Sequence, residues 1–268
     1  MILAAILSAL FLWWFSTGLI LFAVNRAGRG GRDGYQAVTV MTVPLLALAV
    51  FGVVWSSQEA SLLGVYIGFI AALGVWGWIE LAFLTGVVTG PVRLRFPEGA
   101  PEYMRFGLAL RSMQHHEIAV LTGLFVLVLL TWGAVNTVGM LTYAVLFFAR
   151  ISAKLNLYLG VPNINVEFLP APIKHLESYF QIGPMNRFFP LTVTLLTLGL
   201  GWWVEQAITA PDQIAQVGYV LLASLTGLAL VEHWFMVVRL PDAVLWRWII
   251  DRTNSRDSRE GVITQTDP

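Results

Sequence analysis

The sequence predicts an all-α membrane protein, a single bundle of seven transmembrane helices. Three observations predict it: the composition, the length of the apolar stretches and the distribution of the basic residues. The chain has 268 residues, of which 57% are hydrophobic and only 12% are charged, against about 25% charged in an ordinary soluble domain. Its mean hydropathy is +0.72. Apolar stretches fill most of the length, which leaves no room for a separate soluble domain.

Seven stretches approach or exceed the roughly 20 apolar residues that a helix needs to cross the hydrocarbon core. They are residues 2–24, 37–55, 61–88, 118–135, 138–160, 188–209 and 214–238. Helix-breaking residues separate them, and Pro44 inside the second stretch predicts a kink. The first stretch is too long for a signal peptide and no basic segment precedes it, so we expect a retained span.

The basic residues predict the orientation of the chain. With seven spans, all 16 Lys and Arg residues fall in alternate loops, near the adjoining helix ends or after the seventh span. Basic residues gather on the cytoplasmic side of a membrane. The sequence therefore predicts a periplasmic N-terminus and a cytoplasmic C-terminus.

Three cytoplasmic segments are more than turns. We expect residues 91–117, 161–187 and 239–250 to lie at the membrane interface, with a helix in the headgroup layer at 103–108 and a short helix at 173–180. All belong to one membrane domain, residues 1–250, and a polar tail at 251–268 is expected to be mobile.

Composition also excludes several classes of function. The 16 basic and 16 acidic residues balance, and no basic strip with interleaved aromatic residues suggests nucleic-acid binding. There is no cysteine, and no nucleophile elbow, phosphate-binding loop or dinucleotide fingerprint is present. Any site must therefore use His, Asp, Glu, Arg, Lys or backbone groups.

Ionisable residues within the spans are the candidate functional residues, because charges in a membrane are costly and are usually retained for function. Imidazole and carboxylate groups suit iron or zinc, and a single imidazole can bind the metal of a tetrapyrrole. The metal-ligand candidates are Glu80, His116, Glu117, His175, Glu232 and His233. The candidates for binding a cofactor such as bacteriochlorophyll or a precursor are His115, His116, His233, Arg150 and Lys154.

The spacing of these residues leaves alternatives open. No His-x-x-x-His or Glu-x-x-His pair occurs, although such pairs are typical of helical metal sites. Glu80 and Glu232 could instead pair with Arg150 and Lys154 and stabilise helix packing. A metal centre, a tetrapyrrole site and structural ion pairs all remain compatible with the pattern.

Three motifs resemble a known family. FLWWFSTG at residues 11–18, MQHHE at 113–117 and above all KLNLYLGVPNIN at 154–165 are similar to the PuhE-like family of photosynthetic complex assembly proteins of purple bacteria. The resemblance runs from the first span to the seventh. It implies a multi-pass protein of the bacterial inner membrane, cytoplasmic or intracytoplasmic, and it supplies no catalytic residue.

The resemblance implies an assembly factor for the photosynthetic reaction centre and core antenna. Its expected partners are membrane lipids and subunits of those complexes, and it would bind or hand over bacteriochlorophyll. The alternative is a metal-dependent membrane enzyme, an oxidoreductase that acts on a lipid or pigment precursor at the His and Glu cluster.

Overall fold

A computed structural model of the chain describes residues 1–164, 166 and 169–238, and it confirms the all-α prediction. The helices are α1 (Ile2–Gly28), α2 (Gly31–Met41), α3 (Val43–Ser57), α4 (Leu62–Leu84), α5 (Tyr103–Leu130), α6 (Val138–Leu159), the 3₁₀ helix η2 (Ala171–Tyr179), α7 (Phe188–Ile208) and α8 (Gln213–Phe235). Within the described residues, 7 helical segments are long and apolar enough to cross a membrane, when α2 and α3 count as one. The described chain is thus a multi-pass membrane protein.

The predicted kink in the second span is a break between two helices. Helix α2 ends at Met41, and α3 begins at Val43 with Pro44 in its first turn. Proline has no amide hydrogen to continue the helical ladder. The Thr42 hydroxyl instead caps the end of α2 by donating to the Val38 carbonyl at 2.8 Å.

Helices α1 and α2 form a tight hairpin where the predicted spans, 2–24 and 37–55, left a longer loop between them. Helix α1 continues to Gly28 and α2 begins at Gly31. At Gly34 a Cβ atom would collide with the Ala27 carbonyl oxygen. Glycine is needed there because the two helices approach each other backbone to backbone.

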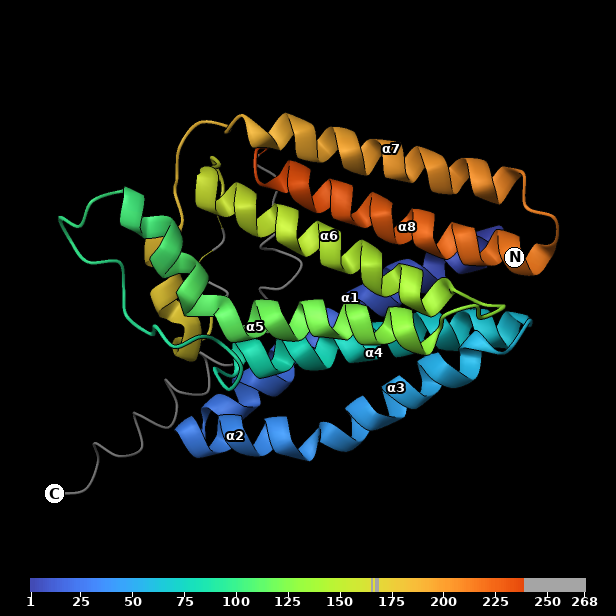
Figure 1. Ribbon diagram of the computed structural model, residues 1–268, viewed down its shortest axis with the longest axis horizontal. Helices are drawn as coiled ribbons and strands as arrows, with labels where there is room; N and C mark the ends of the chain where they lie inside the picture. The colour runs from blue at the N-terminus through green and yellow to red at the C-terminus, as the bar shows by residue number, and fades with distance from the viewer. Residues whose placement is uncertain (165, 167–168, 239–268) are drawn as a thin grey trace, which may run out of the picture.

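The predicted interfacial helix at 103–108 is not a separate element. Helix α5 begins at Tyr103, as expected, but continues without interruption to Leu130. In Figure 1 its first turns run at an angle to the rest of the helix. The preceding turn packs closely against α5, since a Cβ at Gly90 would collide with the Arg111 carbonyl oxygen. The predicted short helix at 173–180 corresponds to η2.

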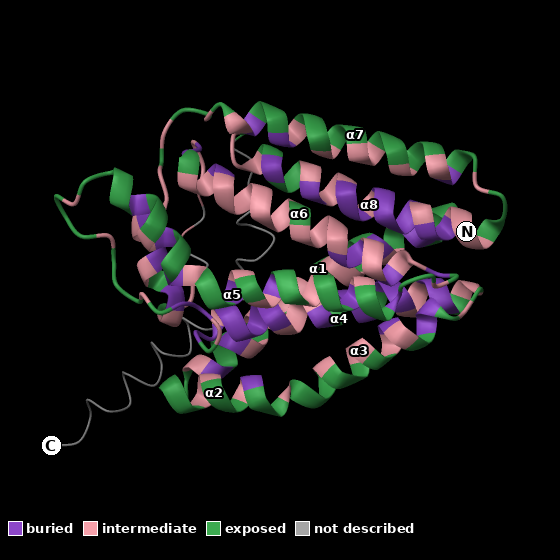
Figure 2. Ribbon diagram, in the orientation of Figure 1, coloured by how far each residue is buried: buried purple, intermediate pink, exposed green. Residues whose placement is uncertain are grey.

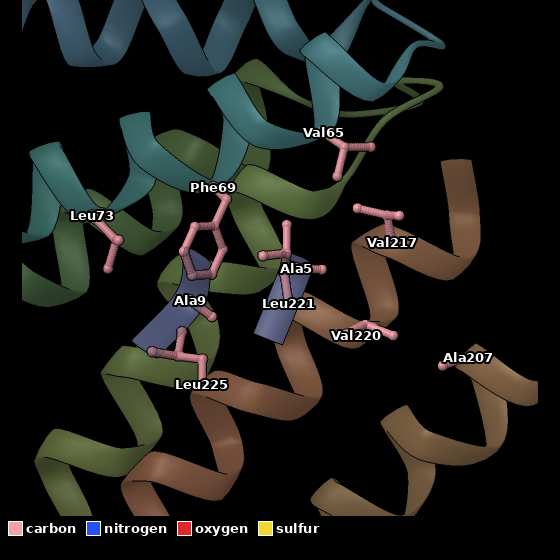
Figure 3. Close-up of a cluster of buried hydrophobic side chains, with 10 residues drawn as sticks. All are labelled: Ala5, Ala9, Val65, Phe69, Leu73, Ala207, Val217, Val220, Leu221 and Leu225. Carbon is pink, nitrogen blue, oxygen red and sulfur yellow. The ribbon is translucent and has the colours of Figure 1, made fainter. Parts of the chain in front are cut away.

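Helices α4 and α8 form the centre of the bundle. In the most apolar 18-residue stretch of each span, 50% of the residues are buried in α4 and 44% in α8, against 11–17% in the other spans. Figure 2 shows this difference along the ribbons. Helix α4 packs against α1, α3, α5, α6 and α8. A buried cluster joins α1, α4, α7 and α8 around Phe69 and Leu221, with the members that Figure 3 labels. The exposed apolar side chains of the outer helices would face lipid.

Small residues of α4 allow close packing against α3 and α6. A Cβ added at Gly68 would lie 3.3 Å from the Gly139 amide of α6 and 3.1 Å from Ser56 Oγ of α3. One at Gly74 would lie 3.0 Å from the Ala49 Cβ of α3. Close approach of this kind is a common way for membrane helices to associate.

The loops that carry basic residues gather at one end of the bundle. Figure 1 shows the α1–α2, α4–α5 and α6–α7 connections together at the end opposite the N-terminus. Among the described residues these connections and the adjoining helix ends carry the Lys and Arg side chains. We call this the basic end. The predicted interfacial segment 239–250 and the tail 251–268 lie outside the described residues.

Candidate functional site

A cavity of about 500 Å³ lies among α1, α4, α6 and α8. Its walls are mainly apolar and include Trp13 of α1, Trp76 of α4 and Leu146 of α6. Ile173 and Leu176 of η2 also line it. The charged residues that line the cavity are Glu80, Arg150, Lys154 and Glu232. The cavity therefore combines apolar walls with a small group of charges, as binding sites for amphiphilic molecules do.

Two ion pairs hold α6 to its neighbours beside this cavity. Arg150 Nη2 donates to Glu80 Oε2 of α4 at 2.8 Å, and Lys154 Nζ donates to Glu117 Oε1 of α5 at 2.5 Å. Part of the structural-pairing alternative is therefore present, with Glu117 rather than Glu232 as the partner of Lys154. Removing only one partner of a buried ion pair destabilises the folded protein, because the other charge is left without a counter-charge.

His116 is fully buried behind Glu80 and does not line the cavity. Its Nε2 lies 3.8 Å from Glu80 Oε1, too far for a hydrogen bond, and neither ring nitrogen has a partner among the described residues. The ring stacks on Phe83 with centroids 4.2 Å apart, and Lys154 Nζ lies 5.6 Å from the same Phe83 ring. Phe83 therefore contacts both His116 and the cation of the Lys154–Glu117 pair.

His233 lines the cavity, but its ring nitrogens are engaged by the protein. Nδ1 donates to the Ala229 carbonyl at 2.7 Å. Nε2 faces the Ser152 hydroxyl at 2.9 Å, and that hydroxyl also lies 2.9 Å from the Ala149 carbonyl oxygen. The residue is 1% exposed. In this arrangement neither nitrogen is available to a ligand in the cavity, and His233 instead joins α6 to α8.

Glu232 differs from the other carboxylates at the cavity. Its side chain is exposed and lines the cavity, and it makes no hydrogen bond or ion pair with any described residue. Glu80 and Glu117 are both paired. Glu80 Oε2 is bonded to Arg150, although its Oε1 has no hydrogen-bond partner among the described residues. Glu232 is thus the cavity carboxylate of the described chain that forms no ion pair with a cation.

The remaining candidates lie away from the cavity. His115 is exposed on the other side of α5, and His175 is half-buried in η2. Burial, together with the nearby charge of Arg93, lowers the pKa of His175 below its ordinary value of 6.5. Its imidazole is therefore neutral near pH 7.

The candidate metal ligands do not form a single centre. Among residues 1–164, 166 and 169–238, no three His, Asp or Glu side chains lie close enough together to hold a metal ion. Glu80 and His116 approach each other, while Glu117 is bound by Lys154. The predicted convergence of all six residues is thus absent from the described structure.

Asparagine residues that the sequence analysis did not single out fix the basic end of the cavity. Asn186 Nδ2 donates to the Gly160 carbonyl at 2.8 Å and to Asn156 Oδ1 at 3.1 Å. Its Oδ1 accepts from the first two amides of α7, those of Phe188 and Phe189. These bonds join the end of α6 to the start of α7.

Asn163 extends this connection to α8. Its backbone amide donates to the Met236 carbonyl at 3.0 Å, and its side chain lines the cavity. Asn156 and Asn163 both lie in KLNLYLGVPNIN, the stretch on which the family resemblance mainly rests. This stretch therefore positions the cavity wall, although its polar residues carry no metal-ligand signal.

Arg105 is a further buried charge that the sequence analysis did not include among the candidates. It is 7% exposed, and it donates to the carbonyls of Tyr179 and Tyr158, both at 3.3 Å. Its guanidinium also lies 4.5 Å from the centre of the Tyr158 ring. Arg105 thereby fixes α5 to the end of α6 and to η2, two of whose residues line the cavity.

Fold and site together define a polytopic helical membrane protein with a partly open, mainly apolar cavity that also carries charged residues. Residues 1–257 match the family described as "Protein of unknown function (DUF3623)", and the chain belongs to this family. It is 45% identical over 244 residues to the "Uncharacterized 30.4 kDa protein in puhA 5'region" of Rhodobacter capsulatus, which covers 91% of this chain and 89% of the relative. No solved structure matches the chain.

The position of this relative links the family to a photosynthesis gene region. The predicted resemblance is therefore supported as far as this gene region is concerned.

Proposed function

We propose that this protein is an integral membrane assembly factor for the photosynthetic reaction centre and core antenna, and that its cavity holds bacteriochlorophyll or a precursor. The observation that carries the proposal is the cavity of about 500 Å³ among α1, α4, α6 and α8. The gene region of the relative supplies the photosynthetic context.

The lining of the cavity suits a planar amphiphile. Trp13 and Trp76 offer flat aromatic surfaces, and Arg150 offers donors for carbonyl or carboxylate groups. A volume of this size falls within the range of about 300–1,000 Å³ that is usual for ligand pockets. The donor set of the cavity contains carboxylate oxygen, which suits magnesium. The residues present therefore fit a magnesium tetrapyrrole.

The alternative of a metal-dependent oxidoreductase gains no support from the geometry. It needs several His or carboxylate ligands around one point, and the candidates in the described chain are paired with cations, engaged by the backbone or apart from one another. No specific observation favours this second function.

The proposal includes a location and an orientation. The protein would reside in the bacterial inner membrane, cytoplasmic or intracytoplasmic, with the basic end of the bundle in the cytoplasm because basic loops remain on that side. The periplasmic N-terminus and the cytoplasmic C-terminus follow from this placement. Pigment would then enter or leave near the cytoplasmic surface.

The test is an absorption spectrum with elemental analysis on protein purified gently from its native membrane. We expect magnesium tetrapyrrole in near-stoichiometric amount, together with reaction-centre or antenna subunits. Ala149→Phe should fill the cavity and remove the pigment, since Ala149 lines it. Leu195→Phe on the exposed face of α7 is the matched control. Absence of both pigment and those subunits from the unmodified protein would refute the proposal.

A further inference from the structure

We infer that Glu232, rather than any of the histidines, coordinates the magnesium of the bound tetrapyrrole, and that Arg150 donates to an oxygen at the edge of its ring. This inference rests on the proposed function and assigns the residues that would recognise the ligand. It depends on which polar groups of the cavity still have free bonding capacity.

Glu232 is available for coordination. Glu232 is an exposed residue that lines the cavity, and no described residue forms an ion pair with it. A carboxylate without a partner near the end of an apolar span carries a cost, which is smaller than at the centre of the membrane. Coordination of a hard cation such as Mg²⁺ would compensate this cost, because magnesium prefers oxygen ligands.

The histidines are less suitable, for two different reasons. His233 lines the cavity but holds the Ala229 carbonyl with one nitrogen and the Ser152 hydroxyl with the other. His116 has unpartnered nitrogens but is 0% exposed and does not line the cavity. His115 and His175 do not line it either.

Arg150 is the cavity cation that has N–H donors without a hydrogen-bond partner among the described residues. Its side chain is 37% exposed, and only Nη2 is bonded, to Glu80. Its buried Nε has no partner among the described residues. A guanidinium carries five N–H donors. Lys154 is less available, since its side chain is 15% exposed and its ammonium is held by Glu117.

A metal-dependence experiment on the purified full-length protein tests this assignment. The protein is titrated with a magnesium chlorophyllide and separately with its metal-free counterpart, and binding is followed by absorption and circular dichroism. In Glu232→Gln we expect the affinity for the magnesium form to fall by about tenfold or more and the affinity for the metal-free form to stay unchanged. Glu232→His should restore binding of the magnesium form, because imidazole is also a good ligand.

Two further variants sharpen the result. Glu205→Gln changes an exposed carboxylate outside the cavity and should bind both pigments as the unmodified protein does. Arg150→Lys keeps the charge but loses the fixed geometry of the donors, so it should weaken both pigments alike.

The outcomes separate the inference from the proposed function. If the unmodified protein binds neither pigment, the pigment-holding function fails and the inference fails with it. If it binds pigment but Glu232→Gln binds both forms as tightly as the unmodified protein, the assignment of Glu232 is wrong and the cavity remains a pigment site. Equal loss of both forms in Glu232→Gln would likewise overturn coordination by Glu232.

Discussion

The ion pair between Glu80 and Arg150 allows a quantitative test of how charges are held within the bundle. Arg150 Nη2 and Glu80 Oε2 are 2.8 Å apart, and the exposed fractions of the two side chains are 37% and 11%. The two ions therefore lie in unequal surroundings. Replacing either one should reveal that inequality in the free energy of unfolding.

Arg150→Met leaves the more buried ion without its partner. Removing one member of a buried pair costs about 3–5 kcal/mol, and Glu80 has little access to water, so we expect a loss in this range. Glu80→Gln leaves Arg150, whose side chain is 37% exposed, and should cost about 1–2 kcal/mol. The double variant should cost less than the sum of both, because it leaves no unpaired ion.

Reversible unfolding in mixed micelles, titrated with a denaturing detergent and followed by circular dichroism, measures these differences. Leu195→Met on the exposed face of α7 is a control for a substitution without a charge. Strictly additive effects, or a larger loss for Glu80→Gln than for Arg150→Met, would refute the reasoning. Additive effects would mean that the pair does not couple α4 to α6, and the reversed order would mean that Glu80 is not the less hydrated of the two ions.

Three further predictions follow from the described contacts. Asn186→Ala should lower the free energy of unfolding by about 2–3 kcal/mol, since it loses the cap of α7 and the bonds to Gly160 and Asn156. Asn186→Ser keeps a capping oxygen and should lose about 1 kcal/mol less in the same titration; equal losses would contradict the capping role. Because burial and Arg93 lower the pKa of His175, unfolding favours its protonation, so stability should decrease as the pH falls below about 6.5. In His175→Gln this part of the pH dependence should disappear, and a stability profile from pH 5 to 8 checks it; an unchanged profile would rule out His175 as its source. Gly34→Ala should destabilise the α1–α2 hairpin through collision with the Ala27 carbonyl, whereas Gly107→Ala meets nothing within 4 Å and should be neutral or stabilising by up to about 1 kcal/mol. Thermal unfolding of the two variants compares them, and similar behaviour would show that the hairpin tolerates a side chain at Gly34.

The apolar stretches predicted the number and the approximate positions of the spans because a lipid environment imposes a minimum length and requires helical backbone hydrogen bonds. The boundaries were less predictable where the chain packs on itself. Helices α1 and α2 meet at Gly34, and this contact turns an expected loop into a helical hairpin. The continuity of α5 from Tyr103 to Leu130 also depends on tertiary packing, since its first half alone resembles an interfacial helix.

The sequence predicted where along the spans the candidate residues lie, but not toward which neighbour each side chain points. The sequence located Glu80, Arg150, Lys154 and Glu232 within the spans at one end, and all four line the same cavity. It could not show that Lys154 binds Glu117 rather than Glu232, because the rotation of each helix about its axis depends on packing. The sequence analysis also did not identify Asn186 as a structural residue, since its partners lie on two different connections.

The amino-acid sequence by itself determined the class of protein, the span count and the segregation of basic residues, because these depend on composition along a single chain and on the thickness of a membrane. Only the tertiary structure decided which charges are paired, which histidines are engaged and which groups face the cavity. Those properties depend on helix rotation and on contacts between distant segments. The availability of Glu232 is therefore a property of the packed bundle, where α8 presents this carboxylate to a space that its neighbours leave open.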